Sequence, residues 1–288
     1  MDILIYGTVN SVALALYALG FALVYGICRL PNFAHGAFYV TAGFITWQLL
    51  KILGIPYFIS ALLALVLVGA LGAAMYHFIL ERIRGMAISE IIASYAIGLA
   101  VLESLRELGL KGATFILPTF VEGGMDLLGV PLDYQRIIVI GMGVVIVGFL
   151  WTFVNQTRLG LALKGMAQDE RAALTLGIDS DKMAVVSMAL GSMFAGVAAL
   201  VLLPLGNIVV EQGYHVLIMA VAVCIVGGLG SWTGAILAAF IIGFAQIITE
   251  VTLGTHFKVV VALMAIIITL IIRPSGIFGQ QKELEERV

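Results

Sequence analysis

Long uncharged stretches dominate this chain and determine its predicted elements. Uncharged runs of 21 to 29 residues follow Asp2, Arg29, Lys51, Arg136 and Lys182, and a run of 38 residues follows Glu211. A membrane-crossing helix needs about 20 apolar residues, each rising about 1.5 Å. The longest run therefore holds two crossings, divided near residues 227–234. Two less clean segments at 87–108 and 256–272 bring the prediction to nine.

These segments predict an all-α, polytopic transmembrane helical bundle that forms one domain, 1–288. Interrupted helices would leave about 8 to 9 true membrane segments. The composition agrees, because 62% of the residues are hydrophobic, 11% are charged and the mean hydropathy is +1.13, whereas soluble domains are about 45–50% apolar and about 25% charged. A signal peptide needs basic residues before its apolar core. Only Asp2 precedes the first run, so this run is expected to stay in the mature protein.

Charge and motif content exclude several classes of function. The net charge of −2 provides no basic field for nucleic acid. Cys28 and Cys224 lie inside apolar runs and form no disulfide or metal-binding pattern. The sequence contains no H-E-x-x-H, no G-x-S-x-G and no paired Cys and His spacing. The chain is therefore predicted to be a non-enzyme without metal or cofactor.

Basic residues predict the orientation, since cytoplasmic loops carry an excess of Lys and Arg. If residues 155–182 face the cytoplasm, ten basic residues lie inside and five lie outside. The inside set is Arg29, Arg82, Arg84, Arg158, Lys164, Arg171, Lys182, Arg273, Lys282 and Arg287. The outside set is Lys51, Arg106, Lys111, Arg136 and Lys258. This bias favours an outside N-terminus and a cytoplasmic C-terminus.

No energy source is visible within the chain itself. Gly160 and Gly165 have the spacing of a phosphate-binding loop, but Met166 and Ala167 stand where Lys and Ser or Thr are required. The centres of the uncharged runs hold no carboxylate, which weakens proton coupling. Sodium held by unwound helix carbonyls stays open. His35, His77 and His215 are read as polar residues satisfied by neighbouring helices rather than as proton carriers.

Two stretches predict interruptions in the helices. In 30–36, Pro31 lacks an N–H and Gly36 lowers helix propensity, so the helix is expected to begin late or unwind there. Asn32 and His35 could then face a substrate path. Asn32 could equally cap the next helix. In 227–235, four glycines within eight residues predict either a tight turn or a broken helix on such a path. The translocation-path candidates are Asn32, His35, Gly36, Gly228, Gly230 and Ser231.

The polar segment 155–182 is the longest predicted cytoplasmic stretch. Within it, 169–177 predicts a short helix, with acids at its start and Gly177 at its end. Ala173, Leu174 and Leu176 are apolar but have little around them to pack against. This helix is expected to dock into a soluble subunit, or else to rest on the membrane surface as an amphipathic helix.

Small residues recur every four positions in two runs, and such rows let membrane helices approach closely. They are Ser187, Gly191 and Ala195, and Ala235, Ala239 and Gly243. Each row is predicted to be a helix contact face.

The stretches 20–26 with 32–36, 165–178, 227–235 and 273–279, in this order, resemble the LivH-type permease subunit of branched-chain amino-acid ABC importers. The resemblance covers nearly the whole chain. Ala37 stands where that family commonly has an acidic residue, so no role of that carboxylate is carried over. The resemblance implies a second, LivM-like permease subunit, two cytoplasmic ATPases and an extracytoplasmic binding protein, in the inner membrane. The ATPase contact would involve Gly165, Ala167, Asp169, Glu170, Ala173, Leu174 and Gly177.

The expected activity is therefore inward movement of a small amino acid, with ATP hydrolysed on partner subunits. Two alternatives stay open. The same assembly could carry urea or a short amide, or the chain could be an ion-coupled secondary transporter.

Overall fold

The computed structural model describes residues 1–110, 115–127 and 129–279. Lys111, Lys282 and Arg287, which were counted for the orientation, lie outside these residues. The α-helices are α1 (Asp2–Cys28), α2 (His35–Lys51), α3 (Tyr57–Phe78), α4 (Ala87–Leu105), α5 (Tyr134–Gln156), α6 (Arg158–Gln168), α7 (Glu170–Thr175), α8 (Ser180–Leu202), α9 (Val210–Gly227), α10 (Trp232–Leu253) and α11 (Lys258–Ile272).

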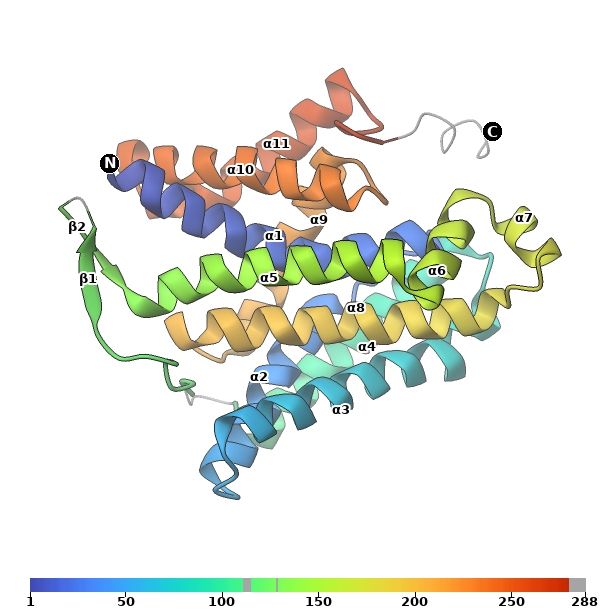
Figure 1. The fold of residues 1–288 in the computed structure, drawn as a ribbon, viewed down its shortest axis with the longest axis horizontal. Coiled ribbons are helices and arrows are strands. Elements are labelled where there is room, and N and C mark those ends of the chain that lie inside the picture. The colour runs from blue at the N-terminus through green and yellow to red at the C-terminus, as the bar shows by residue number, and fades with distance from the viewer. Residues whose placement is uncertain (111–114, 128, 280–288) are drawn as a thin grey trace.

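Short elements complete the described chain. The 3-10 helices are η1 (Leu80–Ile83), η3 (Leu203–Leu205) and η4 (Thr255–Phe257), and η2 (Arg106–Leu110) is a π-helical turn. The strands β1 (Gly124–Leu127) and β2 (Val130–Asp133) pair antiparallel, with Met125 opposite Leu132. Figure 1 shows this hairpin at one end of the bundle and α6 and α7 at the other. We call these the hairpin end and the α7 end.

Within the described residues, eight helical segments are long and apolar enough to cross a membrane, which confirms the predicted all-α fold with its 8 to 9 segments. The ninth segment is α2, whose 17 residues are fewer than the about 20 that a crossing needs. Its helix begins only at His35, after a non-helical stretch, as Pro31 and Gly36 predicted. Leu30, Asn32 and Ala34 in that stretch are buried. Burial by protein is what allows non-helical backbone at membrane depth.

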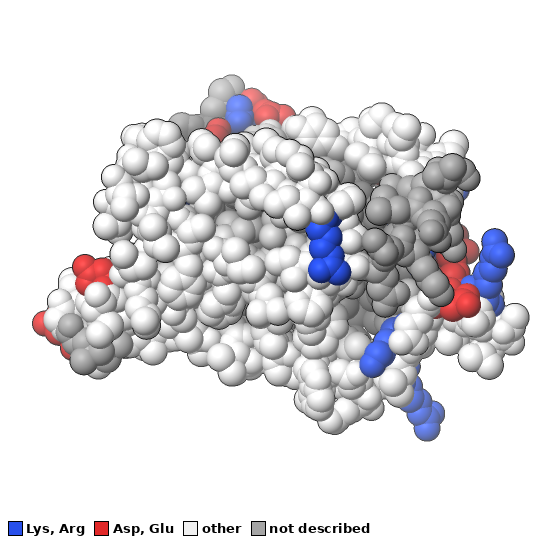
Figure 2. Space-filling view, turned by 90° about the horizontal axis from the view of Figure 1, so that it is seen from above, with Lys and Arg blue, Asp and Glu red and all other residues white. Residues whose placement is uncertain are grey.

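Helix α1 forms the centre of the bundle, because α10, α8, α9 and α5 pack around it. It is buried along most of its length, whereas Ala262 is the only buried residue of α11. The outer helices α3, α5, α10 and α11 expose large apolar side chains, which suits a lipid environment. Most of the surface in Figure 2 is uncharged, with acidic side chains at the left and both basic and acidic ones at the right.

Both predicted rows of small residues are confirmed as contact faces. Ser187, Gly191 and Ala195 are buried, and a Cβ on Gly191 would come within 2.2 Å of the Val24 side chain in α1. Ala235, Ala239 and Gly243 are buried as well, and a Cβ on Gly243 would lie 2.4 Å from Ser11 Oγ. Side chains of minimal size therefore set the close approach of α8 and α10 to α1.

Candidate functional site

The polar segment 155–182 folds into α6 and α7, which carry their own caps. Thr157 Oγ1 accepts a hydrogen bond from the Gly160 amide at 2.9 Å and starts α6. Asp169 Oδ1 accepts one from the Ala172 amide at 3.0 Å and starts α7. Beyond α7, Gly177 has φ 80°, and the Ile178 amide donates to the Ala173 carbonyl at 3.1 Å. This is a Schellman ending, so the predicted start and end of the short helix are confirmed.

Helix α7 presents an apolar surface away from the bundle. Leu174 and Leu176 are 50% and 81% exposed. Ala173 is buried, so the expectation that it has little around it to pack against is wrong. Asp169, Glu170 and Gly177 are exposed, Gly165 and Ala167 are half-buried in α6, and Gly165 has open space around it. The structure thus gathers the seven predicted coupling residues at one end of the molecule.

Arg84 ties α7 to the rest of the bundle, and sequence reasoning missed it apart from its charge. Arg84 lies between η1 and α4. Its guanidinium donates to Glu170 Oε1 at 2.6 Å, and it also bonds to Ser180 and Asp181 at the start of α8. Ser180 Oγ donates to the same Glu170 oxygen at 2.6 Å. Three chain segments are therefore joined through one side chain.

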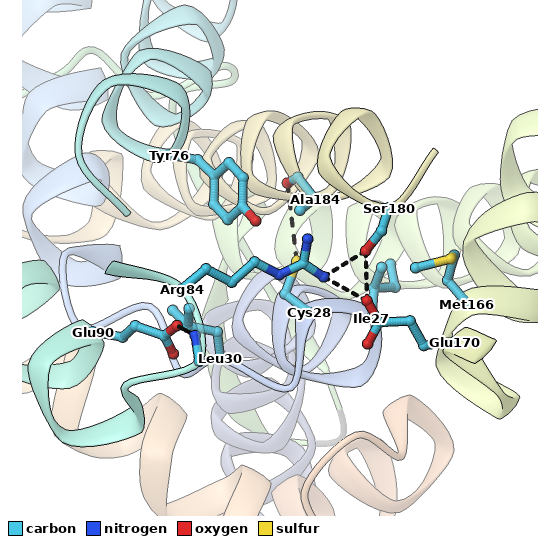
Figure 3. Close-up of a pocket in the computed structure, with 11 residues that line it drawn as sticks. Ile27, Cys28, Leu30, Tyr76, Arg84, Glu90, Met166, Glu170, Ser180 and Ala184 are labelled. Atoms are coloured by element: carbon cyan, nitrogen blue, oxygen red, sulfur yellow. Dashed lines mark hydrogen bonds and ion pairs between the residues drawn. The ribbon is translucent and has the colours of Figure 1, made fainter. Parts of the chain in front are cut away.

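The Arg84 network borders a cavity of about 280 Å³ behind α7, at the end of α1. Figure 3 shows Arg84 reaching across it from the side of Tyr76 toward Glu170 and Ser180. Glu90 accepts a hydrogen bond from the Gly85 amide at 2.7 Å and thereby fixes the turn next to Arg84. The lining residues are Ile27, Cys28, Leu30, Tyr76, Arg84, Gly85, Glu90, Met166, Glu170, Ser180 and Ala184.

The charge state of Arg84 is fixed by its neighbours. Burial alone would lower the pKa of its guanidinium, but Tyr76, Glu170 and Asp181 outweigh this and raise the pKa above its ordinary value. Arg84 therefore stays protonated while it holds the two carboxylates. No three His, Cys, Asp or Glu side chains converge on a metal-binding geometry anywhere in 1–110, 115–127 and 129–279.

The predicted path residues Asn32 and His35 are both buried. Asn32 lies in the connection between α1 and α2, and His35 is the first residue of α2. Asn32 Oδ1 accepts a hydrogen bond from the Ala34 amide at 3.0 Å, so its side chain shapes the turn before α2. His35 Nε2 donates to the Tyr17 carbonyl of α1 at 2.9 Å. Asn32 Nδ2 and His35 Nδ1 are buried without a hydrogen-bond partner among the described residues. Leaving a buried polar atom without a hydrogen-bond partner is costly.

Gly36 lies where α2 crosses α9. A Cβ on Gly36 would come within 1.9 Å of the Gly213 carbonyl oxygen, and a Cβ on Gly213 would lie 3.0 Å from the Gly36 carbonyl oxygen. The two backbones touch because neither residue has a side chain.

The glycine-rich stretch 227–235 forms the connection between α9 and α10. Gly228 and Gly230 have φ 102° and 84°, and Ser231 Oγ accepts a hydrogen bond from the Gly234 amide and starts α10. A tight turn is thus what the structure has here. A Cβ on Gly26 would lie 3.0 Å from the Gly230 oxygen, whereas His35 lies against Gly20. The two groups of path candidates therefore sit at different levels of α1, about 9 Å apart along the helix.

The final described segment closes on this connection. The Ile277 and Phe278 amides donate to the carbonyls of Val226 and Gly227 at 2.9 and 3.0 Å. Gly276 has φ 77°, and a Cβ on it would lie 2.5 Å from Gly228 Cα.

Replacing Gly276 with alanine is therefore expected to detach this segment, because both strain and a backbone clash oppose the new methyl group. Amide hydrogen exchange in a peptide covering 274–279 should speed up by about tenfold, which corresponds to about one net hydrogen bond. Gly141→Ala is the matched control, since the space around Gly141 is open. Equal exchange in both variants would contradict the contact.

These features define a class: an all-α, multi-pass membrane protein with a short capped helix held at one end. The model of the family described as branched-chain amino acid transport system, permease component, matches residues 3–270, so the chain belongs to that family of transport proteins.

Individual relatives agree with the family assignment. The chain is 29% identical to the high-affinity branched-chain amino acid transport system permease protein BraD of Pseudomonas aeruginosa, over 96% of this chain and 95% of that protein. It is 32% identical to a probable branched-chain amino acid transport permease protein LivH of Methanocaldococcus jannaschii, over 94% and 90%. Among solved structures, PsaBC from Streptococcus pneumoniae in complex with Fab has a similar fold, with TM-score 0.53, 17% identity, and coverage of 100% of this chain and 96% of that one.

Proposed function

We propose that this chain is the membrane permease subunit of an ABC importer that moves branched-chain amino acids inward, driven by ATP hydrolysed on partner subunits. The observation that carries the proposal is α7. This six-residue helix is capped at both ends, is tied to two other segments through Arg84, and exposes Leu174 and its C-cap residue Leu176. Because an isolated helix of this length is unstable in water, the chain holds it in place for a partner.

The partners follow from this arrangement and from the family. Two cytoplasmic ATPases would bind the α7 end of this chain and of a second, LivM-like permease. An extracytoplasmic binding protein would deliver the amino acid to the hairpin end. The N-terminus then faces outside and the C-terminus faces the cytoplasm of a cell whose inner membrane holds the complex. Asn32 and His35, with their unpartnered buried atoms, would belong to the path.

The coupling role is tested by the double variant Asp169→Ala, Leu174→Ser. Loss of the Asp169 cap costs about 1 kcal/mol, and loss of Leu174 removes the exposed apolar contact. In proteoliposomes holding the full complex, ATP-driven leucine uptake is expected to fall by at least about tenfold, within the usual range of coupling energies, while the subunit stays membrane-inserted.

Leu53→Ser is the matched control, since Leu53 is 66% exposed and follows α2, far from α7. Normal uptake by the double variant would contradict the coupling role. Uptake by the purified chain alone, without ATPases, would instead favour an ion-coupled secondary transporter. Uptake of urea in preference to leucine would favour the other cargo.

A further inference from the structure

A second cavity, of about 210 Å³, opens at the hairpin end, among α1, α2, α9 and the connection between α8 and α9. Tyr17 and Tyr39 are buried, whereas Leu205 and the two residues after it are exposed. The cavity therefore has a buried aromatic floor and an exposed mouth. Its lining residues are Tyr17, Tyr39, Leu202, Leu203, Leu205, Gly206, Asn207 and Gln212.

The polar part of the lining consists of uncharged groups. Tyr17, Tyr39 and Gln212 line the cavity together, and the rings of Tyr17 and Tyr39 meet edge to face at 5.6 Å. The neighbouring carboxylate, Glu211, is 71% exposed and pairs with Arg106 at 3.2 Å. No charged residue lines the cavity, so a ligand with a net charge would find no counter-charge there.

The remaining lining is apolar or belongs to a helix start. Leu202, Leu203 and Leu205 form one wall. Gln212 lies in the first turn of the 18-residue helix α9, whose N-terminus carries partial positive charge. Hydroxyl groups and a helix N-terminus suit a carboxylate, and broken membrane helices use such ends to hold anionic substrate groups. The lining therefore combines aliphatic side chains with features that suit a carboxylate.

We propose that this cavity is a binding site for an aliphatic α-amino acid, which deepens the proposed function and rests on it. The carboxylate faces Tyr17, Tyr39 and the start of α9, and the branched side chain lies on the leucine wall. A volume of about 210 Å³ equals that of about seven water molecules at roughly 30 Å³ each, which accommodates one small amino acid. Urea would leave the leucine wall without a partner.

The test uses the full complex in proteoliposomes and a leucine analogue that carries a diazirine in its side chain. Light should attach the analogue to the peptide that contains residues 202–205, and excess leucine, but not urea, should compete. Tyr39→Phe and Gln212→Leu remove polar groups but keep most of the packing volume. Each should lower both labelling and leucine uptake by about tenfold, because each hydrogen bond to a charged group is lost.

Two further variants separate a binding role from a structural one. Tyr57→Phe is the matched control. The Tyr57 hydroxyl also donates a partly buried hydrogen bond, to the Leu200 carbonyl at 3.1 Å. Because Tyr57 does not line the cavity, uptake should stay normal. Leu205→Ala should lower uptake of leucine by about threefold relative to alanine, since about one apolar contact is removed, without lowering the unfolding temperature.

The outcomes distinguish this site from the proposed function. If the wild-type complex does not import leucine, the proposed function fails, and this site fails with it. If the complex imports leucine but labelling falls outside the cavity, or Tyr39→Phe behaves like Tyr57→Phe, the function stands and the site is rejected.

Discussion

Replacing Arg84 with alanine is expected to lower ATP-driven uptake by at least about tenfold while the chain stays folded and membrane-inserted. Arg84 contacts Glu170 on α7 and Ser180 and Asp181 on α8. Without it, two carboxylates would remain close together, and the Ser180 hydrogen bond to Glu170 would be left to hold α7 to α8. The side chains are 35% to 51% exposed, and exposed ion pairs stabilise proteins by about 0–1 kcal/mol each. The effect should therefore appear in coupling far more than in stability.

The measurement compares leucine uptake with ATP hydrolysis in the same vesicles. ATP hydrolysis by the Arg84→Ala complex should continue without matching transport. Arg84→Lys should rescue uptake only in part, because an ammonium group keeps the charge but lacks the planar fork that joins several acceptors. Arg82→Ala is the control: it removes the same charge two residues away, where the described chain has no ion pair. Equal loss in the two alanine variants would contradict a specific tether.

The sequence predicted the transmembrane architecture well because the signal is local. Uncharged runs of membrane length are sufficient to locate the helices, since lipid forces each helix to satisfy its own backbone. Local rules also predicted both ends of α7, from Asp169 and Gly177, and the late start of α2 after Pro31. In each case the physical cause lies within a few residues of its effect.

The rest could not be predicted because it depends on contacts between distant segments. Arg84 and Glu170 are 86 positions apart, and in the sequence Arg84 appears only as one more basic residue near a helix end. The second cavity brings Tyr17 and Tyr39 to Leu203 and Gln212, and none of these belongs to a recognisable motif. Buried tyrosines in membrane helices were the one available signal, and it does not distinguish packing from binding.

The two cavities share α1 and lie at different depths. Tyr17 lines the one that opens at the hairpin end, and Ile27 lines the one behind α7. Ten residues of helix separate them, about 15 Å. His35 lies against Gly20 in this interval and bonds to the Tyr17 carbonyl. The intervening part of α1 is buried against α8 and α9. Under the proposed function, passage from one cavity to the other therefore requires α2, α8 or α9 to move against α1.

A substitution at Gly36 tests whether this residue packs α2 against α9 or lines the translocation path. Gly36→Ala is expected to destabilise the subunit by about 3 kcal/mol, at the upper end for overpacked cores, because the new methyl group would lie 1.9 Å from the Gly213 carbonyl oxygen. Backbone cannot move aside as a flexible side chain can, so α2 would have to separate from α9. Thermal unfolding in detergent should show a lowered midpoint. Gly148→Ala, in open space on α5, should leave the midpoint unchanged or raise it, since alanine favours helix. If Gly36→Ala abolished transport at an unchanged midpoint, Gly36 would line the path rather than hold α2 against α9.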